Sequence, residues 1–451
     1  MADITDIVAV DIAIQDSAPK AIEFDTIAVV ADAPFQGGRL YAISPQGLAA
    51  MATDGFAAHS RAKQIVSRIS GQSGAAAQAY IWGRTANQTQ ELELTVDIAV
   101  TAVGQVIAFS VSYAGVTSSI SVTVAVNTVN AILDLIEAAI DASAAGIAGI
   151  AVAPDNATAT LLEITNAVPG TFVQFDGFPR SIHIEDVSVA GTGFAAELAA
   201  MKAELSESVY GLLIDGYSAS EIALAAAFTE ANHMLFLGQS ADNEIVTSGT
   251  GDIATTLSGA SYTRSNVFFS RYMSGDIAAA LLGRQLGQVP GSSNWALQTL
   301  AGVPADRLTS AAHAFARGKH ALTYTTDRGT AKTWDGWAAN GSRYFDVMHG
   351  VDALQADIET REYQVLLNAE KVPFNATGRA MFETALRASL TAAEGNVGVP
   401  GLIEPGWTVT APNLVGYSPV DKAARVMRTF AWTAVMTGAV SSLGIAGTLT
   451  L

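Results

Sequence analysis

Residues 211–237 have the sequence GLLIDGYSASEIALAAAFTEANHMLFL. The stretch opens with a short apolar run, Gly211 to Ile214, and closes with a second one, Met234 to Leu237. Between the two runs, the spacing of apolar residues predicts an amphipathic helix near Ala219 to Ala231. A buried strand, a helix and a second buried strand in succession are typical of an α/β domain.

The same alternation continues on both sides of this stretch. Short apolar runs recur at Tyr80 to Trp82 and at Val267 to Phe269. We expect the intervening helices near residues 58–70, 195–206, 277–288 and 305–317. Together these segments predict one α/β domain built from residues 21–85 and 190–320.

Residues 86–189 differ in composition from the segments around them. Arg180 is their only basic residue, against eleven acidic residues. Polar and apolar residues alternate at Glu91–Val96 and Phe109–Tyr113, which predicts strands, and the 3.6-residue pattern of residues 130–142 predicts one helix. We therefore expect an inserted, acidic, β-rich outer domain.

Residues 321–451 are expected to form a C-terminal α+β domain with a terminal strand. A strand pair is predicted first, followed by helices near residues 351–369 and 377–393. The predicted fold class is thus α/β and α+β multidomain, with an α/β core, an inserted β-rich domain and extended terminal strands.

Both ends of the chain have the alternating pattern of a half-buried strand. The apolar positions of the N-terminal arm, residues 1–20, and of the C-terminal strand include Val8, Val10, Ile12, Ile14, Leu443, Ile445, Leu449 and Leu451. A strand at a chain end needs a partner for its backbone and a cover for its apolar face. That partner is either a sheet of the same domain or a sheet of a neighbouring subunit.

A helix is predicted to precede the C-terminal strand. Ser418 is its candidate N-cap, and a proline follows at the first helical position. Lys422, Arg425 and Arg428 recur every three residues, so a helix would gather them into a basic ridge. The ridge would either contact an acidic partner or form an ordinary solvated face.

Composition excludes several classes of function. The 451 residues include 24 basic and 42 acidic residues, for a formal net charge of -18, and no cysteine. Nucleic acid and anionic lipid would be repelled by this charge, and disulfides and thiol chemistry are excluded. The acidic opening lacks the basic start of a secretory signal. The charge-free stretches 98–133 and 429–451 are too polar or too glycine-rich for membrane spans, so no membrane insertion is expected.

No catalytic, cofactor-binding or metal-binding constellation is expected. The G-x-G pairs at Gly191 and Gly249 lack the third glycine of a dinucleotide fingerprint, and we interpret them as turns that lead into helices. His313 and His320 are interpreted as structural histidines rather than a zinc pair. A phosphate-binding loop with its lysine is absent from the sequence.

Several segments, in their order along the chain, resemble one protein family. Residues 24–31 (FDTIAVVA), 38–43 (GRLYAI) and 79–84 (AYIWGR) are similar to its N-terminal α/β half. Residues 344–354 (YFDVMHGVDAL) and 372–378 (VPFNATG) are similar to segments that precede two of its helices, and the basic helix with the terminal strand is similar to its ending. The family is the tail-sheath proteins of contractile-tailed bacteriophages and phage-tail-like particles. Asp54-Gly-Phe56 departs from the family's aromatic-glycine pattern, and the resemblance does not cover residues 86–189.

The resemblance implies a structural subunit of the virion tail sheath rather than an enzyme. Such subunits assemble in the host cytoplasm as stacked hexameric rings around a tail tube, and contraction drives the tube through the host envelope for genome ejection. The implied partners are further copies of the chain, the tail tube protein, and baseplate and tail terminator proteins, without direct contact to nucleic acid and without a cofactor. The terminal strands would pair between subunits, and Lys422, Arg425 and Arg428 would face the tube.

Two other interpretations remain open at this point. The chain could be an α/β enzyme with an inserted substrate domain, in which case the loop at Gly249 would be the first place to look for a site. It could also be a surface adhesin, which the serine- and threonine-rich strands favour and the absence of a signal peptide opposes.

Overall fold

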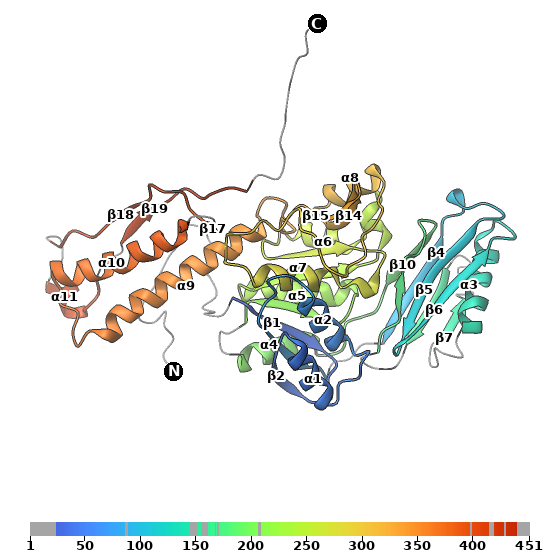
Figure 1. Ribbon diagram of the computed structural model, residues 1–451, viewed down its shortest axis with the longest axis horizontal. Coiled ribbons are helices and arrows are strands. Elements are labelled where there is room, and N and C mark those ends of the chain that lie inside the picture. Colours follow the sequence, from blue (N-terminus) through green and yellow to red (C-terminus); the bar gives the residue numbers. More distant parts are fainter. Residues whose placement is uncertain are drawn as a thin grey trace, which may run out of the picture. The chain divides into compact units, whose positions relative to one another are not determined.

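The computed structural model describes residues 24–85, 89–143, 151–154, 161–166, 168, 171–205, 209–396, 399–414, 419–427 and 430–439 (Figure 1). The chain divides into two compact units. The larger unit comprises Glu23–Gln288 and Trp295–Phe345, and the smaller includes Val289–Asn294 and Asp346–Leu451. Each unit is described by itself below, within the described residues.

The larger unit is built on an eight-stranded mixed sheet with the order β15-β14-β13-β12-β11-β1-β3-β2. From β3 to β14 all neighbouring strands are parallel, whereas the edge strands β2 and β15 are antiparallel to their neighbours. The strands are β1 (Thr26–Ala31), β2 (Gly37–Ala42), β3 (Gln78–Gly83), β11 (Gly211–Ile214), β12 (Leu235–Ser240), β13 (Ser265–Phe269), β14 (Leu322–Asp327) and β15 (Thr330–Trp334). The predicted α/β class is confirmed.

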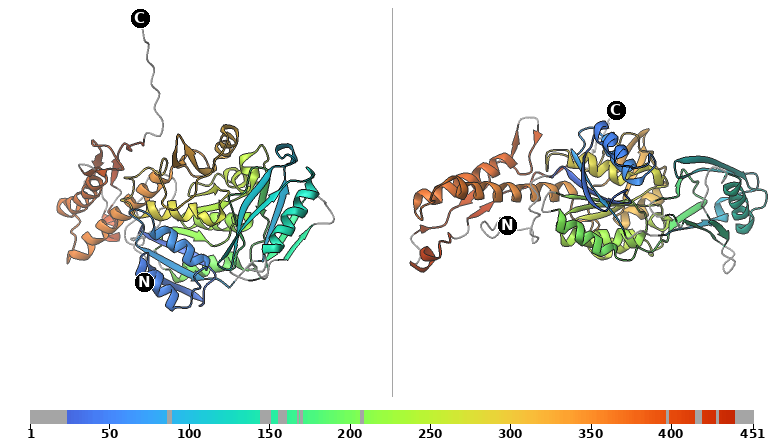
Figure 2. Two further views of the ribbon diagram at one scale, coloured as in Figure 1. Left: turned by 45° about the vertical axis from the view of Figure 1, so that its right-hand side comes forward. Right: turned by 90° about the horizontal axis from the view of Figure 1, so that it is seen from below.

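Helices cover both faces of this sheet (Figure 2). One face packs against α4 (Phe194–Glu204), α5 (Ala219–Ala231), α6 (Ile253–Gly259) and α8 (Ser310–Gly318). The other face packs against α2 (Arg61–Ser70) and α7 (Ile277–Leu286), with α1 (Pro45–Thr53) beside α2. Because both faces are covered, the central strands are buried along their whole length, which is why they read as short uninterrupted apolar runs.

The βαβ unit of residues 211–237 follows from its local sequence. Ser218 caps α5 by accepting a hydrogen bond from the Glu221 backbone N–H at 3.3 Å. The position of Gly211 has no room for a side chain, because a Cβ atom there would be 2.6 Å from Cδ1 of Leu286 on α7. Leu212, the next residue, faces the opposite layer and is fully buried. The observed α5 has the bounds that the sequence predicted.

The insertion between β3 and α4 contains two antiparallel sheets and one long helix, at the right of Figure 1. The sheets have the orders β10-β4-β8-β7 and β6-β5-β9. Their buried residues form one core together with α3. The elements are β4 (Gln90–Val96), β5 (Val106–Tyr113), β6 (Val116–Thr123), α3 (Val129–Ser143), β7 (Ala151–Pro154), β8 (Leu161–Asn166), β9 (Gln174–Asp176) and β10 (Ile182–Asp186).

The strand pair expected at the start of the C-terminal domain belongs to the large sheet instead. Leu322 of β14 pairs in parallel with Phe268 of β13, and β15 forms a hairpin with β14. The compact C-terminal unit therefore starts at Asp346 rather than at residue 321. A short apolar run does not reveal which sheet it will join, because parallel pairing links segments that are distant in sequence.

The smaller unit contains two long helices and two short antiparallel sheets of two strands each. The helices α9 (Phe345–Asn368) and α10 (Ala376–Ala393) contribute apolar residues to a common core. The Asn375 side chain caps α10 by accepting hydrogen bonds from the backbone of Thr377 and Gly378. The remaining elements are β16 (Gly395–Asn396), β17 (Val399–Pro400), β18 (Thr408–Thr410), α11 (Pro419–Ala424) and β19 (Ala431–Thr433).

Among the described residues, none of the helices combines the length and the apolar character that crossing a membrane requires.

Candidate functional site

The smaller unit contains a two-stranded antiparallel sheet, β18 with β19. Val409 lies opposite Trp432, and Thr408 lies opposite Thr433 with their hydroxyl oxygens 2.8 Å apart. No third strand joins either strand within the part of the chain that the structure describes. Each strand therefore presents one row of backbone N–H and C=O groups to which a further strand could pair.

One face of this small sheet is anchored on the helices. Val409, Trp432 and the flanking Phe430 pack against the α9–α10 core. Phe430 also contacts Phe382 of α10 edge to face, with ring centroids 6.3 Å apart. One face of the sheet is thus packed against the helices, while the other face, which carries the threonines, is exposed.

The chain continues past β19 in an extended path beside the segment before β18. The backbone N–H of Glu404 donates to the carbonyl of Val435 at 2.7 Å, and that of Thr437 donates to the carbonyl of Leu402 at 2.9 Å. Ile403 forms a bridge with Met436. This path leads directly to the segment that the sequence predicts as the C-terminal strand.

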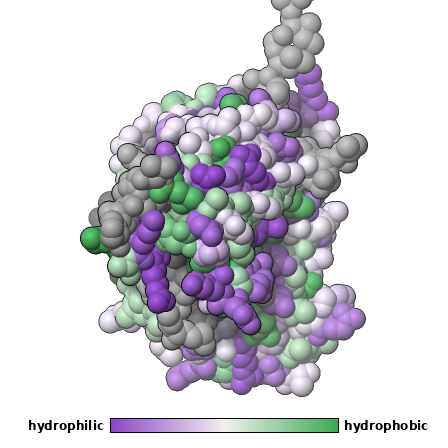
Figure 3. All heavy atoms as spheres, turned by 90° about the vertical axis from the view of Figure 1, so that its left-hand side faces the viewer, coloured by the Kyte–Doolittle hydropathy of each residue, from purple (hydrophilic) through white to green (hydrophobic). Residues whose placement is uncertain are grey.

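Apolar side chains near the small sheet are exposed singly rather than as one patch. Val420 and Val435 are 76% and 64% exposed, and Val426 and Met436 are also exposed. Figure 3, which faces the side of the molecule at the left of Figure 1, shows green residues interspersed with purple and white ones. Any partner of this surface would consequently rely on backbone pairing as much as on apolar contact.

The predicted terminal strands lie outside the described residues. This applies to Val8, Val10, Ile12 and Ile14 of the N-terminal arm, and equally to Leu443, Ile445, Leu449 and Leu451 at the C-terminal end. Their pairing between subunits remains a prediction.

The predicted basic helix is wrong in its length. Helix α11 ends at Ala424, and Arg425 has a φ of 59°, in the left-handed region. Phe430, Trp432 and Ala434 contact the unit's core at every second position, which is the period of a strand. The free energy gained by packing these side chains from a strand exceeds the free energy that extending the helix would provide. Lys422 and Arg425 are exposed and do not share a helix, and Arg428 lies outside the described residues.

The carboxyl edge of the large sheet is where an α/β enzyme would bind its substrate. Arg84, at the end of β3, occupies this edge and is buried with two carboxylates. Its guanidinium contacts Asp215, which follows β11, at 2.6 Å, and also the carboxylate of Glu221 on α5. The Asp215 carboxylate accepts a further hydrogen bond from the Asp32 backbone N–H at 2.9 Å.

A second buried ion pair lies beside this cluster. Arg61 of α2 donates to both carboxylate oxygens of Asp276, at 2.6 and 3.1 Å, and its guanidinium lies over the Tyr217 ring. Asp276 raises the pKa of Arg61, so the guanidinium stays charged. Two arginines face three carboxylates here, and burial raises the pKa of Glu221 to about 7, so the edge is occupied by a buried ion network.

The loop at Gly249 is filled by an acidic side chain. The Glu244 carboxylate accepts a hydrogen bond from the Gly251 backbone N–H at 2.7 Å, and a Cβ atom on Gly249 would overlap that carboxylate. A dinucleotide phosphate would meet negative charge at this place. The loop leads into α6, whose N-cap is Asp252, and the Gly191 loop leads into α4, as predicted for both.

The two histidines predicted to be structural lie in separate aromatic environments. His313 contacts the Trp334 ring, and His320 contacts the Trp337 ring and lies beyond the end of α8. Burial lowers the pKa of His313. Within the described ranges, no group of three or more histidine or acidic side chains is placed to hold a metal ion.

The insertion docks on the same carboxyl edge. Gln174 of β9 donates to the Tyr217 hydroxyl at 2.7 Å, and the Asp176 carboxylate accepts from the hydroxyl and backbone N–H of Ser274. Tyr217 and Met273 belong to the hydrophobic core of the insertion. Both polar and apolar contacts therefore fix this domain to the sheet.

Asp306 lies at this joint and makes stability depend on pH. Its carboxylate is buried and accepts the Arg271 backbone N–H, at 3.2 and 3.4 Å to its two oxygens, and a hydrogen bond from the Ser270 side chain; burial raises its pKa to about 7. Its pKa in the unfolded chain is about 3.9, so the folded state binds the extra proton between these values. The stabilisation of the folded state that this group contributes is fully present below about pH 4 and is lost as the pH rises through 7.

We expect Asp306→Asn to remove this dependence. Between pH 5 and pH 8 the wild type should lose about 3 kcal/mol of unfolding free energy that the variant keeps. Urea unfolding followed by circular dichroism at both pH values measures the difference. Asp327→Asn, at a half-exposed position on β14, is the matched control and should follow the wild type. Equal pH dependence in Asp306→Asn and wild type would contradict the assignment.

Comparison with known proteins gives structural similarity without sequence matches. The sequence matches no protein-family model and no curated protein. The structure is similar to the crystal structure of the sheath tail protein from Desulfitobacterium hafniense, with 11% identity and a TM-score of 0.47, over 96% of this chain and 100% of that one. It is also similar to a chain of the cryo-EM structure of the anti-feeding prophage baseplate, with 14% identity and a TM-score of 0.43, over 57% of this chain and 73% of that one.

Proposed function

We propose that the chain is a structural subunit of a contractile tail sheath. Copies would form stacked hexameric rings around a tail tube, within a virion or a related tail-like particle assembled in the host cytoplasm. Contraction would drive the tube through the host envelope. The partners would be other copies, the tail tube protein, and baseplate and tail terminator proteins.

The observation that supports this proposal most is the small sheet of β18 and β19. It is anchored on α9 and α10 through Val409 and Trp432, and no third strand pairs with it among the described residues. In the described part of the chain, this sheet has no charged residues, packs on one face against two helices and has unpaired edge strands. Such a sheet suits β-augmentation by a segment of another chain. Main-chain hydrogen bonds also tolerate large rigid-body movement of the subunits that they join, provided that the connecting segment is extended.

The two chain ends are the proposed donors. Ile4, Val8, Val10, Ile12 and Ile14 share one side of an extended segment, and residues 5–14 would span roughly 30 Å at about 3.3 Å per residue. Leu443, Ile445, Leu449 and Leu451 provide the same pattern at the other end. Each subunit would then both accept and donate strands, which links the rings into a continuous mesh.

In this mechanism the subunit does no chemistry. The extended sheath would be metastable, and contraction would move nearly rigid subunits into a wider and shorter lattice of lower energy. The buried ion clusters at the carboxyl edge support this assignment, since they link β3 with β11 and α5, and α2 with the start of α7, through paired side chains. The acidic insertion would lie on the outside of the sheath.

Lys422, Arg425 and Arg428 are proposed to face the tail tube. Lys422 and Arg425 do not share a helix, so these two would act as separate charges. We expect Arg425→Glu to weaken co-sedimentation of the chain with purified tail tubes about tenfold at low salt, because one favourable charge contact becomes repulsive. Arg387→Glu, at an exposed position of α10, changes the net charge equally and should bind as the wild type does. Unchanged binding of both variants would remove these residues from the tube contact.

Negative-stain electron microscopy of the purified chain tests the proposed function directly. Rings or striated tubes support a sheath subunit. Compact, monodisperse particles at all concentrations would refute it and would favour the enzyme or the adhesin interpretation.

A further inference from the structure

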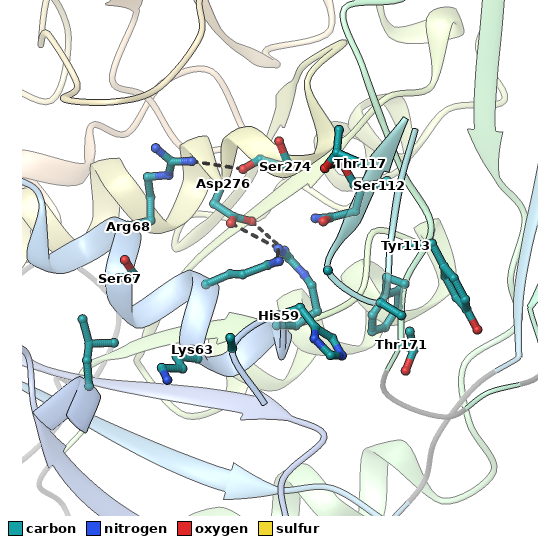
Figure 4. A pocket seen from close by; sticks show the side chains of 18 residues that line it. His59, Lys63, Ser67, Arg68, Ser112, Tyr113, Thr117, Thr171, Ser274 and Asp276 are labelled. Carbon is teal, nitrogen blue, oxygen red and sulfur yellow. Dashed lines mark hydrogen bonds and ion pairs between the residues drawn. The ribbon is translucent and has the colours of Figure 1, made fainter. Parts of the chain in front are cut away.

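The larger unit contains a cavity of about 750 Å³ between helix α2 and the insertion (Figure 4). One wall is formed by residues 58–68, which include the first two turns of α2. The opposite wall is the β5–β6 hairpin with Ser112, Tyr113 and Thr117, together with Phe172 and Gln174. This volume is within the range of small-molecule sites in proteins.

The cavity is basic although the chain is strongly acidic. Three cationic side chains line it, namely Arg61, Lys63 and Arg68, and His59 lies beside them. The only acidic residue in the lining is Asp276, whose two oxygens are both bound by Arg61. That ion pair is neutral overall, so it does not cancel the charges of the other two cations.

Lys63 and Arg68 lack a carboxylate partner among the residues that the structure describes. Arg68 donates only to the backbone carbonyls of Gly302 and Ser274, which satisfies its hydrogen bonds but leaves its charge uncompensated. Lys63 is half-buried, and no salt bridge or hydrogen bond involves its ammonium group within the described ranges. Both side chains line the cavity, where Figure 4 shows them on different sides of α2, so positive charge borders it from two directions.

The helix end and the neighbouring hydroxyls add hydrogen-bond donors. Ser60, the N-cap of α2, makes no capping hydrogen bond, so first-turn N–H groups of α2 have no side-chain acceptor from it. Gln64, Ser67, Ser112 and Thr117 place further polar groups in the lining. Donors and positive charge thus come from two separate parts of the fold.

We propose that this cavity binds a small polyvalent oxyanion, a compound with two or more phosphate or carboxylate groups. Lys63 and Arg68 would supply the charge, and the hydroxyls of the β5–β6 hairpin would bind the remaining oxygens. Bound between α2 and the insertion, the ligand would also strengthen the joint between the insertion and the large sheet. The site is separate from the small sheet of β18 and β19 and does not depend on polymerisation.

Calorimetric titration of the full chain with sodium pyrophosphate and, separately, with citrate tests the proposal at constant ionic strength. We expect saturable binding of at least one of the two compounds, with a raised unfolding temperature. Lys63→Glu should weaken binding at least about tenfold, because a charge-assisted contact is replaced by repulsion. Binding of pyrophosphate alone would identify a phosphate ligand, and binding of citrate alone a carboxylate ligand.

Two further variants separate a built site from general attraction of anions. Lys371→Glu changes the net charge equally at an exposed position outside the cavity, so it should bind as the wild type does. Ser67→Trp keeps every cation but fills the cavity, and it should abolish binding with unchanged circular dichroism. The proposal is overturned if neither compound binds saturably, or if Lys63→Glu and Ser67→Trp both bind as tightly as Lys371→Glu.

Discussion

Deletion of residues 1–16 is expected to yield a folded subunit that no longer forms tubes. The deletion removes the proposed donor strand and none of the contacts described above, so the unfolding temperature should be unchanged. The polymer should be lost almost completely, since the arm is one of the two proposed donors and each β18–β19 sheet would lose the strand that it accepts from this arm. Sedimentation velocity and negative-stain microscopy of the full chain and of the truncated chain measure this effect.

Point variants on the two faces of the arm sharpen this test. Ile12→Asp places a charge on the apolar face of the predicted strand and should prevent assembly. Ala13→Asp adds the same charge one residue later, on the opposite face, and should assemble normally, because successive side chains of a strand alternate between faces. Normal tubes from the truncated chain would refute the arm assignment even if the chain proved to be a sheath subunit.

Arg84→Leu is expected to cost about 3 to 5 kcal/mol of unfolding free energy. Arg84, Asp215 and Glu221 are each almost fully buried, so loss of the guanidinium leaves two carboxylates without a counter-charge. Urea unfolding followed by circular dichroism measures the loss at pH 7.5. Should Arg84→Leu fail to fold, that outcome is the extreme of the same prediction.

Two comparison variants distinguish loss of charge balance from loss of packing. Arg39→Gln, on the adjacent strand β2, breaks a half-exposed ion pair with Asp54 and should cost under about 1 kcal/mol. Neutralising the whole cluster, Arg84→Met with Asp215→Asn and Glu221→Gln, should recover much of the stability, because no buried charge is left unpaired. A change below about 1 kcal/mol for Arg84→Leu alone would show that the cluster does not stabilise the fold.

Periodicity predicted most of the larger unit from the sequence. Helix α5 has the predicted bounds, and α3 agrees to within one residue, because both are long and are bordered by clear capping or turn residues. Helix α8 begins at Ser310 rather than near residue 305. The preceding Asp306 instead pairs with the backbone of β14, a tertiary contact that the helical pattern does not contain.

The candidate site was harder to predict than the fold. Strands β18 and β19 have three residues each, too few for an alternation to be recognised. The basic spacing of residues 422–428 suggested a longer helix, although Phe430, Trp432 and Ala434 already had the two-residue period of a strand. Arg84, Asp215 and Glu221 form one cluster across more than a hundred positions, so no local motif could identify it. Arg84 and Asp215 lie at the ends of predicted strands, which was the available signal, whereas Glu221 lies within the predicted helix.

The edge strands of the large sheet, β2 and β15, are poorly suited to pair with a strand of another chain. The outer side of β15 is already bonded to a loop, since Thr333 exchanges backbone hydrogen bonds with Leu297 and Gln298. Strand β2 carries Arg39 and two glycines, which disfavour docking of a foreign strand. Within the described residues, the short threonine-lined pair in the smaller unit has neither a bonded loop nor a charged residue in its strands. Among the described residues, the edges of the largest sheet are thus less suited to accept a foreign strand than those of the small sheet, where the proposed polymer would join.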